Sequence, residues 1–149
     1  MSMYRKTETK FTDKDILIDS LVAAGYDRSV IEVPETAQQL YDYHGSPTRY
    51  TDNAGDKANI IIRRHHLGYS SGNDIGFKYD PVTKTYTGMI SDYDSGNGQW
   101  GPESSRMKAT EVAYGYLKTK KTLLRNGFKF LGKEVVNGKL QAKYLDMRA

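Results

Sequence analysis

The stretch 75-IGFKYDPVTKTYTGMISDY-93 decides the fold, because it carries the plainest local pattern in the chain. Two segments of alternating polar and apolar residues flank a turn at residues 80–84 that contains Pro81. Alternation with a period of two is typical of strands that bury one face, and a short connection joins antiparallel neighbours. The stretch therefore predicts a β-hairpin in the middle of an antiparallel sheet.

The residues before this hairpin add strands and one helix. Weak or β-branched patterns predict strands over residues 3–11, 30–33 and within the run 58-ANIIIRRHHLGY-69. Thr12 can cap a helix that continues through an apolar face to Gly25. Residues 34–57 are rich in Gly, Pro, Asn and Asp, so we expect a long connection there with one helical turn near residues 38–41.

The residues after the hairpin predict a long helix and a last pair of strands. A Gly-rich loop at residues 94–105 holds the only tryptophan, Trp100, and Gly127 ends the helix that follows. A turn at Asn137-Gly138 joins two strands. The positions expected to face the core are Ala109, Val112, Ala113, Tyr116, Leu117, Leu123 and Leu124 on the helix, and Val135, Leu140, Ala142 and Tyr144 on the strands.

Together these elements predict one α+β domain over residues 1–149. It should contain an antiparallel sheet of five to six strands packed against two main helices, with the helices in a single layer on the sheet. The segments at about 34–57 and 94–105 should be loops. Trp100 is expected to plug the core, although a binding lid is an alternative.

Composition excludes several classes of protein. The chain of 149 residues has no cysteine, which rules out disulfides and thiolate metal sites and is compatible with a reducing cytoplasm. It has neither an export signal near its start nor an apolar run of the ~18 residues that cross a bilayer, so we expect no membrane partner. The net charge is +4, divided as −2 over residues 1–74 and +6 over residues 75–149. This asymmetry moderately indicates a polyanionic partner.

One face of the long helix is the first candidate site. The 3.6-residue period places Tyr114, Lys118, Lys121 and Arg125 together, as a ladder of cations for phosphates with a tyrosine for stacking. The alternative is a solvated face whose cations favour the helix dipole. Lys120 falls in the middle of the apolar face, where it either extends to water along its stem or lines the rim of a ligand pocket.

The sequence RRHH at residues 63–66 is the second candidate. On a strand, Arg63 and His65 would share one face and Arg64 and His66 the other, and either pair could hold a phosphate. Adjacent histidines diverge and no carboxylate or cysteine ligand has metal spacing, so a metal site is not expected. Neither a GxSxG nor a GxxxxGK[ST] motif is present, and we expect no catalytic residue and no cofactor.

Three functions stay open at this point. The first is a small non-enzymatic protein that binds a phosphate-containing ligand, nucleic acid or a nucleotide, through the basic Tyr-bearing helix face. The second is an adaptor or inhibitor of a host protein, or a homo-oligomer, with Tyr4, Tyr86, Tyr93 and the two loops in the contact. The third is a phosphate-ester enzyme that uses His65 or His66.

A family resemblance accompanies this layout. The segment 10-KFTDKDILIDSLVAAGY-26, the order of the elements and the helix with Tyr114 and Lys118 resemble a small family of cyanobacterial, plastid and phage proteins, named from a hypothetical plastid reading frame. That family has no agreed activity. The resemblance implies a small accessory protein, encoded by a phage and working in the host cytoplasm, and supplies no catalytic residue.

Overall fold

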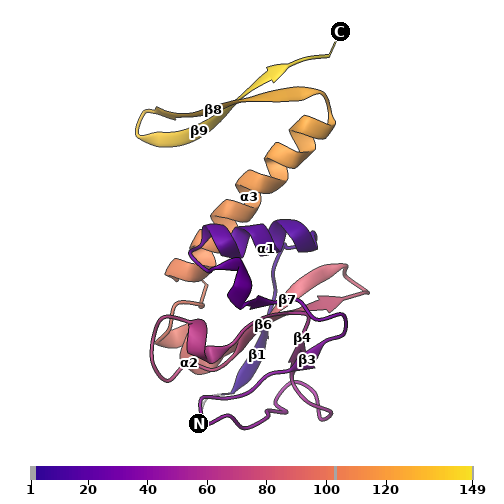
Figure 1. Cartoon of the computed structure of the whole chain (residues 1–149), viewed down its shortest axis with the longest axis vertical. Coiled ribbons are helices and arrows are strands. Elements are labelled where there is room, and N and C mark those ends of the chain that lie inside the picture. Colours follow the sequence, from indigo (N-terminus) through magenta and orange to yellow (C-terminus); the bar gives the residue numbers. More distant parts are fainter. Residues whose placement is uncertain (1–2, 103, 149) are drawn as a thin grey trace.

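A computed structural model describes residues 3–102 and 104–148. Its main sheet has five antiparallel strands in the order β1-β7-β6-β5-β2 (Figure 1). These strands are β1 Tyr4–Thr7, β2 Ile31–Glu32, β5 Ile60–Ile62, β6 Ile75–Asp80 and β7 Thr85–Ser91. The hairpin predicted from residues 75–93 is β6–β7 at the centre of the sheet, and the α+β class is confirmed.

The β6–β7 hairpin owes its register to local chemistry at its two ends. At the turn, the Asp80 carboxylate accepts a hydrogen bond from the Val82 N–H at 2.8 Å, as Asx turns do. At the other end, Gly76 pairs with Met89 and lies against Ala58 so closely that a Cβ would overlap the alanine methyl. Only glycine fits that position, and the absence of a side chain lets β6 pack closely against Ala58.

Two helices, α1 Lys14–Ala23 and α3 Ser105–Arg125, pack on one face of the sheet. Asp13 caps α1, with its Oδ1 accepting from the Ile16 N–H at 3.1 Å, so the prediction that Thr12 is the cap was one residue early. The main core lies between these helices and the sheet. Its largest fully buried members are Leu17, Leu21, Ile60, Ile62, Leu67, Ile75, Phe77, Ile90 and Trp100.

Residues 34–57 cover the opposite face of the sheet and are not a structureless loop. They contain β3 Gln38–Gln39, which pairs with β4 Lys57–Ala58, so the predicted helical turn near residues 38–41 was wrong. Leu40 from this segment is buried in a small second core. The buried Asp56 carboxylate accepts from the N–H groups of Tyr50 and Thr51 at 2.8 and 2.6 Å. In these turns, carboxylates accept the backbone N–H hydrogen bonds that neighbouring strands would accept in a sheet.

Trp100 is a core residue. The loop before it begins with a short helix, α2 Asp92–Gly96, and brings the indole to complete burial between Tyr26 and Phe77. Ring centroids lie 5.8 Å from Tyr26 and 6.2 Å from Phe77. The plug prediction for Trp100 is confirmed, and the burial leaves no room for a mobile lid at this residue.

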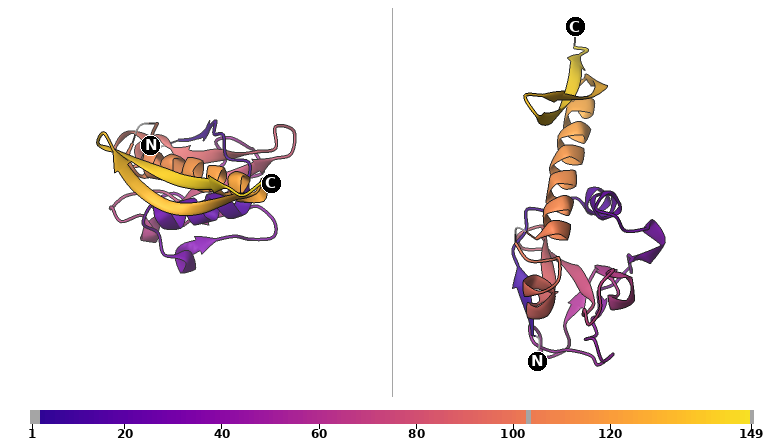
Figure 2. Two further views of the ribbon diagram at one scale, coloured as in Figure 1. Left: turned by 90° about the horizontal axis from the view of Figure 1, so that it is seen from above. Right: turned by 90° about the vertical axis from the view of Figure 1, so that its left-hand side faces the viewer.

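The end of the chain departs most from expectation. β8 Phe128–Val136 and β9 Lys139–Asp146 form a separate two-stranded sheet that crosses the far end of α3, away from the main sheet (Figure 2). The buried residues of α3 are Met107, Thr110 and Tyr114, all in its first half. We call residues 3–114 the body and residues 115–148, the distal half of α3 with the β8–β9 hairpin, the arm.

Two predictions about this region were therefore wrong. The apolar stripe of α3 packs on the core only in part, since Leu117 contacts the core while Val112 is 65% exposed, and Val135 and Leu140 of the hairpin do not enter the core. Length gives the physical reason. The 21 residues of α3 extend about 30 Å, whereas the 10 residues of α1 cover about half of that. The distal half of the helix therefore projects beyond the main sheet, and the β8–β9 hairpin packs on it instead.

Candidate functional site

The predicted phosphate-binding face of α3 divides at the edge of the body. Tyr114 lies inside the body, at 7% exposure, and cannot serve as an exposed stacking platform. Its hydroxyl oxygen accepts hydrogen bonds from the N–H groups of Thr12 and Asp13 at 2.9 and 3.0 Å. These two donors precede α1 and have no partner within that helix. Tyr114 thus ties α3 to the start of α1, which corrects its predicted role.

The cations of this face lie beyond Tyr114. Lys118 and Arg125 project from α3 on the arm, one partly and one fully exposed. Lys121 reaches back, and its Nζ donates to Asp13 Oδ2 at 2.7 Å. Partial burial acts to raise the pKa of Asp13, but the hydrogen bonds from Lys121 and from the Ile16 N–H outweigh it and hold the pKa below its usual value. Lys121 is therefore partly neutralised, while the other two cations extend away from the body.

Lys120 lies over an aromatic ring of the hairpin and not at the rim of a ligand pocket. Its Nζ lies 4.1 Å from the ring centroid of Phe130 on β8, and Lys133 lies over Tyr116 at 4.0 Å. Arg148 covers Phe128 in the same way at 4.8 Å. These cation–π contacts join the hairpin to the end of α3 and bring hairpin cations beside those of the helix. The sequence pattern of the last strands gave no signal for this packing.

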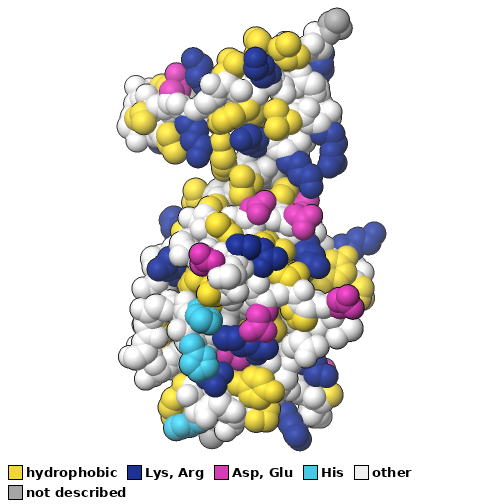
Figure 3. All heavy atoms as spheres, viewed as in Figure 1, with side chains coloured by type: hydrophobic (Ala, Val, Ile, Leu, Met, Phe, Trp, Pro, Cys, Tyr) yellow, Lys and Arg dark blue, Asp and Glu magenta, His cyan; other side chains and the backbone are white. Residues whose placement is uncertain are grey.

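The basic residues of the hairpin enlarge the candidate surface well beyond the helix. Residues 115–148 contain nine Lys or Arg and two Asp or Glu, a net charge of +7, whereas residues 1–114 contain 13 and 16, a net charge of −3. The arm thus carries more than the whole positive excess of the chain. On the face drawn in Figure 3, dark-blue Lys and Arg side chains gather over the arm, interleaved with yellow hydrophobic ones.

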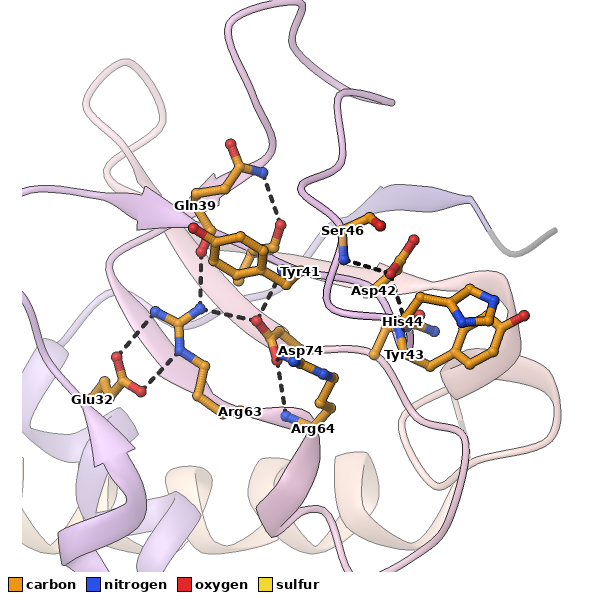
Figure 4. Close-up of polar contacts among 12 residues, drawn as sticks. Glu32, Gln39, Tyr41, Asp42, Tyr43, His44, Ser46, Arg63, Arg64 and Asp74 are labelled. Atoms are coloured by element: carbon orange, nitrogen blue, oxygen red, sulfur yellow. Dashed lines mark hydrogen bonds and ion pairs between the residues drawn. The ribbon is translucent and has the colours of Figure 1, made fainter.

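Arg63 and Arg64 are committed to a buried carboxylate (Figure 4). Asp74 is fully buried, and its two oxygens accept from Arg63 Nη1 at 2.9 Å, from Arg64 Nη1 at 3.2 Å and from the Arg64 N–H at 2.9 Å. Arg63 also pairs with Glu32. Its partial burial would lower its pKa, but the bonds to Glu32 and Asp74 raise that pKa instead. Both arginines are engaged by carboxylates of the body, and the phosphate contact stays a prediction for them.

The RRHH segment is also not a strand. β5 ends at Ile62, and Arg64–His66 form a 3-10 turn, so His65 and His66 do not alternate across a sheet. Both histidines are exposed. Over residues 3–102 and 104–148, no group of three His, Asp or Glu side chains is placed to hold a metal ion. His66 follows Arg64 in the same 3-10 turn, and its predicted phosphate contact stays a prediction.

A third buried carboxylate, Asp94, was not predicted from the sequence. It accepts from Ser91 Oγ at 2.6 Å, Tyr69 Oη at 2.7 Å and the Asn73 N–H at 3.1 Å. Burial, foremost, and the hydrogen bond to Asp94 raise the pKa of Tyr69 well above its usual range. The Asp94 backbone oxygen also accepts from the Trp100 N–H at 3.0 Å. This cluster joins the Trp100 loop to the sheet. Its donors occupy both oxygens of the Asp94 carboxylate, as expected for a buried charge with a structural role.

The tyrosines predicted for an oligomer contact are used within the chain. Tyr4 and Tyr86 are 3% and 6% exposed, and the half-buried Tyr93 donates its hydroxyl to the Ser70 carbonyl at 3.2 Å. None of the three offers a free aromatic surface, because their rings pack within the body.

Comparison with known proteins gives no further guide. No family model, curated protein or solved structure matches the chain. The resemblance to the plastid-named family stays a prediction. Among the helices in the described part of the chain, none is both long enough and apolar enough to cross a membrane.

Proposed function

We propose that this is a non-enzymatic nucleic-acid-binding protein whose arm binds the phosphate backbone. The observation that carries the proposal is the separation of charge: −3 over residues 1–114 and +7 over the projecting arm. A cluster of Lys and Arg on one exposed element attracts a polyanion and orients it toward that element. The body, whose buried carboxylates are saturated by hydrogen bonds, holds the arm in place.

The arrangement favours a long polyanion over a small nucleotide. From Lys118 to Arg125 the helix rises about 10 Å, and the hairpin cations continue the surface, so the charges follow a line of phosphates. The hollow between Lys118, Thr119, Thr122 and Leu123 is about 210 Å³, smaller than the ~300 Å³ at which small-molecule pockets begin. A mononucleotide would therefore contact only part of the basic surface.

The contact should be electrostatic and tolerant of sequence. Phe128, Phe130 and Tyr116 are each covered by a cation, and Tyr114 is buried, so these rings are not open platforms for bases. Phosphate contacts position a protein on nucleic acid without reading its sequence. We expect similar affinity for oligonucleotides of different sequence and a steep fall in affinity as salt rises.

Fluorescence anisotropy with labelled DNA and RNA 20-mers tests the proposal. Lys118→Glu, Arg125→Glu and Lys129→Glu are combined in one chain; Lys121 is left intact because it pairs with Asp13. The slope of log affinity against log salt should fall by roughly 2–3, since three phosphate contacts are lost. The matched control combines Lys6→Glu, Lys10→Glu and Lys14→Glu, which makes the same charge change at exposed body positions.

The two variants separate a localised site from a general charge effect. Binding through the arm predicts a large loss for the first variant and a small loss for the control. Equal losses would show that only net charge matters, and an unchanged first variant would overturn the proposal. Circular dichroism and the Trp100 fluorescence midpoint should match wild type in both.

A further inference from the structure

A groove of about 730 Å³ separates the arm from the body on the side of α3 opposite to Lys118 and Arg125. Its floor is the apolar stripe of α3, its roof is the β8–β9 hairpin, and the end of α1 closes it toward the body. Val112 on the floor and Leu140 on the roof are each 65% exposed. The lining residues that matter are Ala23, Ala109, Val112, Tyr116, Leu140 and Ala142.

The hairpin overhangs this groove with one apolar face uncovered. Val135 pairs with Leu140 and Lys133 with Ala142, so these side chains share a face of the hairpin. Near the root of the hairpin that face packs on α3 through Phe130, whose ring centroid lies 6.3 Å from that of Tyr116. Near the turn, Val135 is 69% exposed. A two-stranded hairpin needs packing on its apolar face to be stable, and half of this face has none within the described chain.

Charges of opposite sign lie on the two sides of the groove, although the charged residues that line it are Lys108 of α3 and Lys133 of β8. Asp15, Asp19 and Ala23 follow one another at intervals of four residues and so share one face of α1. Ala23 lines the groove, and the exposed Asp15 and Asp19 continue from it along the same face of α1 without lining the groove themselves. Lys133 lines the opposite rim, on an arm of net charge +7. Acidic side chains also lie on the body just below the arm in Figure 3.

We propose that a second copy of this chain fills the groove, with the two copies related by a two-fold axis and hooked into one another. A two-fold axis places the same patch on both sides, so the exposed Val112, Val135 and Leu140 of one copy meet those of the other. It also sets the acidic α1 rim of each copy against the basic hairpin of its partner, which is the charge complementarity that a self-association needs. The face with Lys118 and Arg125 lies on the other side of α3, so the dimer would present two arms to nucleic acid.

Sedimentation velocity of the full chain tests this inference. Wild type should sediment as a dimer at micromolar concentration, and Val112→Asp and Leu140→Asp should each raise the dimer dissociation constant at least tenfold. Both residues are largely exposed, so the monomers should stay folded. Val82→Asp is the matched control, because Val82 is 88% exposed in the β6–β7 turn and far from the groove. A wild-type monomer would overturn the proposal and assign the groove to a partner of different sequence.

A charge reversal tests the two-fold arrangement itself. Asp15→Lys combined with Asp19→Lys should weaken the dimer about tenfold, since each copy would then place lysines against the basic hairpin of its partner. Dimerisation that survives this change unaltered would exclude the hooked arrangement. Nucleic-acid affinity per arm is measured in parallel on the Leu140→Asp monomer. If that affinity equals the wild-type value, nucleic-acid binding does not depend on the dimer, and the two proposals are tested separately.

Discussion

The body and the arm use charge in opposite ways. In the body, carboxylates such as Asp74 and Asp94 are fully buried, and each is saturated by several donors. In the arm, cations outnumber acids by nine to two, and three of them lie over the rings of Tyr116, Phe128 and Phe130. Buried charge that is fully paired fixes a structure, whereas unpaired surface charge is available to a partner. Changes in the body should therefore cost stability, and changes in the arm should cost binding.

Asp74→Ala should produce the largest effect. It leaves Arg63 and Arg64 without their shared partner and the Tyr41 N–H without its acceptor, so we expect a loss of about 3–5 kcal/mol in the free energy of unfolding. Urea titration followed by the fluorescence of Trp100, the only tryptophan, measures it. Asp146→Ala on the arm removes a comparable pair with Arg148 in full solvent and should leave the midpoint unchanged. Equal losses would contradict the division between the two regions.

Tyr114→Phe should have a smaller effect on the same titration. The substitution keeps the ring but removes the hydroxyl that accepts from Thr12 and Asp13, so two backbone donors lose their partner and we expect a loss of about 1–2 kcal/mol. Tyr43→Phe is the control, because the Tyr43 ring is 49% exposed. If both changes were neutral, the hydroxyl of Tyr114 would have no part in joining α3 to α1.

The sequence predicted the body well because local signals there agree with burial. The alternation in residues 75–93, the capped helix ending near Gly25 and the β-branched run at residues 60–62 all became elements at those places. The pattern did not predict the order of segment 34–57, since that order comes from Asp42 and Asp56 binding the backbone of nearby turns. Such bonds have no periodicity, and a pattern search cannot find them.

The site was harder to predict, because a helical period shows which residues share a face and not what covers that face. Tyr114 and Lys118 do share a face of α3, yet the body covers the first and ends before the second. The stripe through Val112 is apolar, and the period alone assigned it to the core of the same chain. Val112 lies within the body but on a side of α3 that the core leaves exposed, and the length of α3 carries only the later part of the stripe past α1. The cations of the hairpin were visible in the sequence, but their position beside those of α3 depends on tertiary packing.

Phe130→Ala tests whether the arm is held independently of the body. The ring lies under Lys120 and packs edge-on against Tyr116, so its loss should lower the local opening free energy of β8–β9 by about 1 kcal/mol, roughly a fivefold faster amide exchange. The Trp100 unfolding midpoint should not move. Leu145→Ala, 47% exposed on the other face of the hairpin, should change exchange less. A shift of the body midpoint with Phe130→Ala would mean that arm and body unfold as one unit.

Lys121→Gln should give the smallest effect, because it removes a single, partly exposed ion pair between an arm cation and the body. Lys121 is 44% exposed and Asp13 is 19% exposed, so solvent screening limits the loss at pH 7 to less than about 1 kcal/mol. The pKa of Asp13 is lowered in the folded protein, so the stabilisation is present above the usual carboxyl pKa and is lost as pH falls through the lowered one. Urea titrations should therefore separate wild type from Lys121→Gln at pH 7 and bring them together once the pH is below the lowered pKa of Asp13. Arg125→Gln, at an exposed position of α3, is the control and should match wild type at both values. A difference that persists in acid would show that Lys121 stabilises the body by packing along its stem and not by its charge.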